Sequence, residues 1–124
     1  MNQGIKSFTE LDTWKKGHAL VVLIYKLTKR LPLEEKYLLI DQMRRCAISI
    51  TSNIAEGFSR KSFKEKLNFY SMALGSCTEL QNQLLVCRDI GYISHKEFLD
   101  LANLTVEVNK LINGLMKSTR KYIN

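Results

Sequence analysis

Residues 94–119 read SHKEFLDLANLTVEVNKLINGLMKST, and this stretch decides the fold class. Its apolar positions recur at steps of three and four, which is the spacing of one face of an α-helix. The members of this heptad seam are Phe98, Leu101, Thr105, Val108, Ile112, Leu115, Thr119 and Tyr122. Ser94 and Glu97 precede the seam as a capping box, which satisfies two free backbone N–H groups at a helix start. The stretch therefore predicts a long amphipathic helix.

The same start signal occurs twice more, at Ser7 to Glu10 and at Ser62 to Glu65. Pro32 supplies a start of another kind, because its fixed φ suits the first helical position. Gly91 marks a helix end. The helices expected from these signals cover residues 8–31, 33–58, 63–90 and 95–121.

Long helices joined by short connections force sequential neighbours to run in opposite directions. With one proline and six glycines among 124 residues, the composition leaves little room for the turns of an all-β domain. We therefore predict a single all-α domain over residues 1–124, an antiparallel up-down-up-down four-helix bundle. No signal peptide or membrane span is visible, so the cytoplasm is expected. The odd number of cysteines, at 46, 77 and 87, indicates reduced core thiols.

The expected first helix carries two apolar stripes. We assign its seam to Leu11, Trp14, His18, Val21 and Tyr25. A second stripe comprises Leu20, Ile24, Leu27 and Leu31, and this makes the apolar surface wider than one core requires. Extra apolar surface favours self-association, so a homo-oligomer is expected.

The formal net charge of +7 gathers at one end of the predicted bundle. The end formed by the first helix start, the connection between the second and third helices, and the fourth helix end carries ten basic residues. They are Lys6, Lys15, Lys16, Arg60, Lys61, Lys64, Lys66, Lys117, Arg120 and Lys121. The acidic residues there are Glu10, Asp12, Glu56 and Glu65.

Such a surface attracts phosphates through counterion release. All of these basic residues except Lys6 are therefore candidates for binding RNA, DNA or another acidic partner. The alternative is that the lysines keep a hydrophobic oligomer soluble.

The second helix carries a polar stripe at spacings of three and four, with a complementary residue on the third helix. The stripe is Gln42, Arg45, Ser49, Asn53 and Glu56, and the complementary residue is Glu79. A solvated face explains it equally well. If it is buried, its groups must be paired, and the network then sets the register of an interface.

No catalytic or cofactor-binding motif emerges. Neither histidine has the Glu-x-x-His spacing of a di-iron bundle, so no metal is expected. Arg88 and His95 fit the spaced Arg and His pattern of HEPN ribonucleases, in which arginine stabilises phosphate charge and histidine transfers protons. This stays a remote alternative, because Gly91 separates the two and they lie at the neutral end. A non-enzyme is the preferred prediction.

Four segments resemble one known family, that of the 23S rRNA intervening-sequence proteins. They are residues 8–14, 42–50 and 73–80, and the run Asn53-Ile-Ala-Glu-Gly57 within residues 52–58. The family consists of small bacterial four-helix bundle proteins and is similar to the accessory protein of diversity-generating retroelements. That accessory protein is a ring-forming bundle that binds nucleic acid and a reverse transcriptase.

The resemblance implies a homo-oligomer, a pentamer, without enzymatic activity. Our first prediction is thus a binding module whose basic end contacts RNA, DNA or a nucleic-acid enzyme such as a reverse transcriptase. The second is a scaffolding oligomer that binds another protein. Salt-sensitive retention on nucleic acid distinguishes the first from the second.

Overall fold

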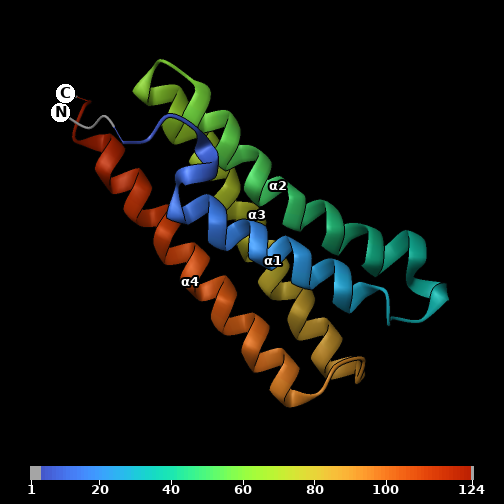
Figure 1. Ribbon diagram of the computed structural model, residues 1–124. Coiled ribbons are helices and arrows are strands. Elements are labelled where there is room, and N and C mark those ends of the chain that lie inside the picture. The colour runs from blue at the N-terminus through green and yellow to red at the C-terminus, as the bar shows by residue number, and fades with distance from the viewer. Residues whose placement is uncertain (1–3, 124) are drawn as a thin grey trace.

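The computed structural model describes residues 4–123, and over these residues the chain is all-α, without a strand (Figure 1). It has four α-helices in this range: α1 (Asp12–Thr28), α2 (Asp41–Ser59), α3 (Phe63–Ile90) and α4 (His95–Arg120). Each of α1 and α3 packs against both α2 and α4. The fold class read from the periodicity is therefore confirmed at the level of four helices.

The first expected helix is shorter than the periodicity indicated. Ser7 and Glu10 do form a capping box, but it closes a 3-10 turn over Phe8–Glu10. Leu11 then adopts an extended conformation, with φ −71° and ψ 130°, and α1 begins only at Asp12. At the other end α1 stops at Thr28, whose hydroxyl donates to the backbone oxygen of Ile24 at 2.8 Å. A capping box thus marks where a helical turn starts without fixing how long it continues.

The second expected helix also begins later than predicted. The chain after Pro32 forms a 3-10 helix over Leu33–Glu35 and a π-helix over Lys36–Ile40 before α2 begins at Asp41. The irregular segment leaves apolar side chains at its surface: Leu33 is 80% exposed and Tyr37 is 81% exposed. Nothing in the apolar spacing distinguishes this wide turn from a regular helix.

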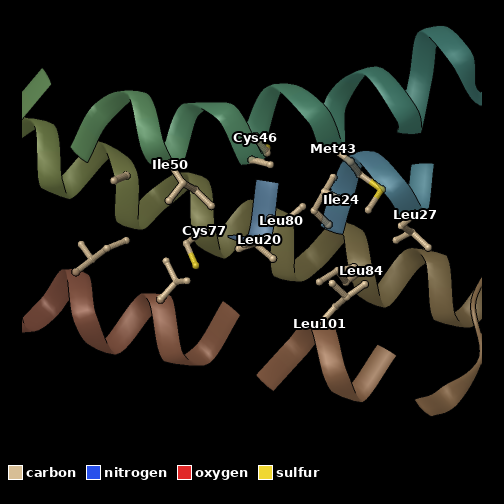
Figure 2. Packing of buried hydrophobic residues seen from close by; sticks show 14 of the residues in the cluster. Leu20, Ile24, Leu27, Met43, Cys46, Ile50, Cys77, Leu80, Leu84 and Leu101 are labelled. Carbon is tan, nitrogen blue, oxygen red and sulfur yellow. The ribbon is translucent and has the colours of Figure 1, made fainter. Parts of the chain in front are cut away.

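The core lies between the four helices (Figure 2). Its labelled side chains are Leu20, Ile24 and Leu27 from α1, Met43, Cys46 and Ile50 from α2, Cys77, Leu80 and Leu84 from α3, and Leu101 from α4. Our assignment of the first seam was therefore wrong. The stripe from Leu20 to Leu31 is buried, whereas His18 is exposed and Val21 is half-buried. The stripe taken as surplus surface is the core stripe and no longer argues for self-association.

The seam of α4 needs one adjustment. Met116 is buried in the position given to Leu115, which is half-buried, and Tyr122 is exposed. A strict heptad repeat has a period of 3.5, but a straight α-helix turns once every 3.6 residues. From Phe98, five such turns lead to Met116, and Leu115 has rotated away from the core.

Glycine is needed at two positions, for different structural reasons. Gly91 adopts φ +91° and ends α3, as predicted. Gly57 lies inside α2. A β-carbon there would lie 2.6 Å from Cε1 of Tyr70, so Gly57 allows α2 and α3 to approach closely. At Gly75, by contrast, no neighbouring atom of the described residues lies within 4 Å of the Cβ position.

Candidate functional site

The start of α1, the turn between α2 and α3 and the end of α4 lie together at one end of the molecule, here called the basic end (Figure 1). Two contacts fix their relation. The rings of Phe63 and Tyr122 stack with centroids 4.9 Å apart, and Thr13 Oγ1 donates to the backbone oxygen of Leu111 at 3.4 Å. A surface hollow of about 610 Å³ lies there. The residues that line it include Ile5, near the start of the sequence, and Tyr122, near its end. Segments from both ends of the sequence therefore build this site.

Most of the predicted binding residues are exposed at the basic end. The ones that make no ion pair with any residue from 4 to 123 are Lys15, Lys61, Lys64, Lys117, Arg120 and Lys121. Their side chains are exposed, and no carboxylate of residues 4–123 forms an ion pair with them. These six side chains make up the exposed, unpaired positive charge of the basic end within the described residues.

Lys66 has a structural role instead. Its Nζ donates to the backbone oxygens of Phe58 at 2.7 Å and Gly57 at 3.3 Å. Carbonyls in the last turn of a helix lack partners within it, and Lys66 satisfies two of them at the end of α2. Burial lowers the pKa of this ammonium group. The lysine keeps its positive charge, but its ammonium group is held at the helix end by these two carbonyls.

Arg60 and Lys16 are also engaged. Arg60 Nη2 donates to Glu56 Oε2 at 2.9 Å, and its guanidinium lies 4.7 Å from the centre of the Phe69 ring. Lys16 pairs with Glu107 of α4 at 3.1 Å. Exposed pairs of this kind are worth about 0–1 kcal/mol each, so they orient the side chains more than they stabilise the fold.

The ion pair between Lys16 and Glu107 extends the charge count along α4. Glu107 must be counted with this half of the molecule, and so must Lys110, one turn further on. The addition of one acidic and one basic residue leaves the excess unchanged at about six positive charges. The excess of positive charge at this end is therefore the same after Glu107 and Lys110 are included.

The polar stripe of α2 is divided between solvent and the contact with α3. Gln42, Arg45, Glu56 and the complementary Glu79 are exposed. Ser49 and Asn53 are half-buried: Ser49 Oγ shares a hydrogen bond of 2.8 Å with Ser76 Oγ, and Asn53 Nδ2 donates to the backbone oxygen of Ser49 at 2.8 Å. Part of the stripe is therefore a solvated face, and part of it is a paired network in the contact between α2 and α3.

Deeper in the same contact, Cys46 lies between Glu79 and Gln83. Its Sγ donates to Glu79 Oε2 at 3.5 Å, and Gln83 Nε2 donates to the sulfur at 3.4 Å. Burial and the charge of Glu79 raise the pKa of the Cys46 thiol. Gln83 Oε1 is buried without a hydrogen-bond partner among the described residues. The stripe therefore joins α2 to α3 within one chain.

At the opposite end, two glutamates pair with an arginine, a backbone N–H group and a tyrosine hydroxyl. Glu97 accepts from the backbone N–H of Ser94 at 3.1 Å and forms an ion pair with Arg30. These interactions, the backbone bond first, lower the pKa of the Glu97 carboxyl. Tyr92 Oη donates to Glu35 Oε2 at 2.7 Å, which raises the pKa of Tyr92 to about 12. A hollow of about 370 Å³ separates α1 from α4 here.

Arg88 and His95, the residues of the ribonuclease alternative, also lie at this end. Arg88 Nε donates to Asp89 Oδ1 at 2.8 Å, and its guanidinium lies 4.7 Å from the centre of the Phe98 ring. His95 is the first residue of α4 and is exposed. The carboxylate beside Arg88 opposes the approach of a phosphate. The alternative stays a prediction, and a ribonuclease activity lost in His95→Ala would support it.

Within residues 4–123 the structure also describes the cysteines, the possible metal ligands and the apolarity of the helices. Cys46, Cys77 and Cys87 are free and buried, and burial raises the pKa of Cys77 to about 11. No group of three or more histidine, cysteine, aspartate or glutamate side chains is arranged to hold a metal ion in this range. None of the described helices has the length and apolarity to cross a membrane.

The fold and the basic end define a small four-helix protein with a charged face. Residues 9–114 match the family of the 23S rRNA-intervening sequence protein. The chain belongs to this family, as the resemblance of residues 53–57 suggested. It is similar to the crystal structure of a protein of unknown function from the S23 ribosomal protein family of Bacteroides thetaiotaomicron. The two chains are 27% identical with a TM-score of 0.79, over 85% of this chain and 95% of that one. No match is found among curated proteins.

Proposed function

We propose that the protein is an antiparallel up-down-up-down bundle that assembles with copies of itself and binds nucleic acid, or a protein associated with nucleic acid, through its basic end. The observation that carries the proposal is the group of six basic side chains at that end that are exposed and form no ion pair within residues 4–123. The contacts at the two ends, Thr13 with Leu111 and Arg30 with Glu97, support the antiparallel arrangement of α1 and α4.

Self-association is supported by apolar side chains left exposed on the helix surfaces. Val22 and Leu23 on α1 and Leu99 and Val106 on α4 are each between 40% and 45% exposed. They replace the stripe from Leu20 to Leu31 as the argument for an oligomer. Light scattering tests the proposal: a pentamer has about five times the 14.3 kDa mass of the chain. A mass equal to one chain at micromolar concentration contradicts it.

Nucleic-acid binding is tested by charge reversal. The test variant changes Lys61, Lys64, Lys117 and Arg120 to glutamate. A control variant changes four exposed lysines of the opposite end by the same amount: Lys26, Lys29, Lys36 and Lys96. Binding to labelled RNA and DNA is measured over a range of salt concentrations. We expect the first variant to lose binding and the control to keep its salt dependence, because only the first removes phosphate contacts.

If both variants lose binding equally, net charge rather than the basic end is responsible, and the proposal fails. Lys16, Arg60 and Lys66 are left out of the test variant because they hold the helices and their ends in place. Their reversal would disturb the structure as well as the charge.

A protein-binding scaffold is the second candidate, and one observation favours it. The segment of 3-10 and π-helix before α2 exposes Leu33, Tyr37 and Leu38 at the end opposite the basic end. Exposed apolar patches commonly mark contacts with other proteins. Salt-insensitive copurification with one protein, abolished by Leu33→Asp and Leu38→Asp together, would favour this function over nucleic-acid binding.

A further inference from the structure

The hollow at the basic end is unusual for its aromatic lining. Four rings line it: Phe58 at the end of α2, Phe63 and Tyr70 in α3, and Tyr122 after α4. Its volume of about 610 Å³ lies within the range of about 300–1,000 Å³ that is typical of small-molecule pockets. The site therefore combines the size of a ligand pocket with flat apolar walls.

Two of these rings are stacked at the surface. Phe63 and Tyr122 are 16° from parallel, and they remain 39% and 68% exposed. An exposed stacked pair leaves the outer face of a ring open to solvent. Such a face is the platform on which proteins bind unpaired nucleic-acid bases.

Each ring of the stacked pair has a lysine next to it in the sequence. Lys64 follows Phe63 in the sequence, and Lys121 precedes Tyr122. Both lysines are exposed and form no ion pair within residues 4–123, and Lys61 and Arg120 lie close by in the sequence with the same properties. The carboxylate of Glu65 is directed to Arg60, at 3.7 Å. Exposed basic residues therefore adjoin both rings in the sequence, and Lys66 lines the hollow itself.

We propose that this hollow binds an unpaired base of single-stranded nucleic acid. The base stacks on the pair formed by Phe63 and Tyr122, and Lys64 and Lys121 bind the phosphates on either side. A duplex does not satisfy the site, because its bases are stacked on one another and their faces are not available. The proposal rests on the proposed function, and it specifies which class of nucleic acid the basic end prefers.

The test compares Tyr122→Ala with the unchanged protein. Tyr122 lies beyond the end of α4, so its removal leaves the helices intact. The probes are a fluorescein-labelled single-stranded oligonucleotide and a duplex of the same length, and anisotropy gives the dissociation constants. Loss of one stacked base weakens binding by roughly 5- to 150-fold. We expect this loss for the single strand and less than a twofold change for the duplex.

Two further variants control the experiment. Tyr37→Ala removes an exposed tyrosine from the opposite end and should leave both dissociation constants unchanged. Tyr122→Phe keeps the ring and should restore most of the single-strand affinity. The salt dependence should be the same in all of these variants, because no phosphate contact is removed.

The outcomes separate the two proposals. If the unchanged protein binds neither probe, the proposed function fails and this inference fails with it. If it binds both probes equally and Tyr122→Ala has no effect, nucleic-acid binding stands and only the base-binding hollow is refuted. A change in the light-scattering mass of Tyr122→Ala would assign the hollow to a contact between copies and would also overturn the inference.

Discussion

Replacement of Gly57 by alanine tests the close approach of α2 and α3. The new Cβ would lie 2.6 Å from Cε1 and 2.9 Å from Cδ1 of Tyr70, and 3.1 Å from Cβ of Phe69. The Tyr70 ring is only 2% exposed, so its neighbours restrict how far it can move. Either the ring or the crossing of α2 and α3 must shift.

The size of the effect follows from two opposing contributions. An extra methyl group in a packed site costs about 1–3 kcal/mol, and contacts this short place Gly57→Ala at the upper end. Alanine gains about 1 kcal/mol over glycine in a helix interior. The free energy of unfolding should therefore fall by about 2 kcal/mol. Gly114→Ala is the matched control, because no described atom lies within 4 Å of its Cβ position, and it should stabilise by about 0.5–1 kcal/mol.

Urea denaturation followed by circular dichroism, at one fixed protein concentration, measures both variants. A double-mutant cycle locates the cause. In a Tyr70→Leu background the ring is absent, so Gly57→Ala should cost much less than in the unchanged protein. The reasoning is refuted if Gly57→Ala is as stable as Gly114→Ala, or if its cost is the same with and without the Tyr70 ring.

Three other predictions concern charge, thiols and assembly. Because the pKa of Glu97 is lowered in the folded protein, its stabilising contribution is complete above the unfolded pKa of about 4.3 and is lost as the pH falls through the folded pKa. The stability difference between the unchanged protein and Glu97→Gln should therefore shrink in acid denaturation series. Burial raises the pKa of Cys77 and of Cys87 to about 11, so a thiol reagent at pH near 8 should modify them only as fast as the chain opens; rapid labelling of the native protein would contradict this. If the exposed Gly75 contacts another copy, Gly75→Ala should lower the light-scattering mass while Gly114→Ala leaves it unchanged; equal masses would remove Gly75 from any interface.

Only part of the candidate site could be predicted from the sequence. The basic residues could be gathered at one end because short connections constrain where helix ends lie, and seven of the nine candidates are exposed there. Lys66 could not be separated from them, because its partners are the backbone oxygens of Phe58 and Gly57 on another helix. The stacking of Phe63 on Tyr122 was also missed, although Tyr122 stood in the predicted seam of the fourth helix.

The sequence by itself determined the helical class, the capping of α3 and α4, and the end of α3 at Gly91, because these depend on local hydrogen bonds and backbone torsions. The tertiary structure decided which stripe of α1 faces inward. Periodicity identifies apolar faces on a single helix, but α1 carries two, and the neighbouring helices bury the one from Leu20 to Leu31. The tertiary structure also explains Gly57. The Tyr70 ring, which belongs to another helix, occupies the space that a side chain at position 57 would need.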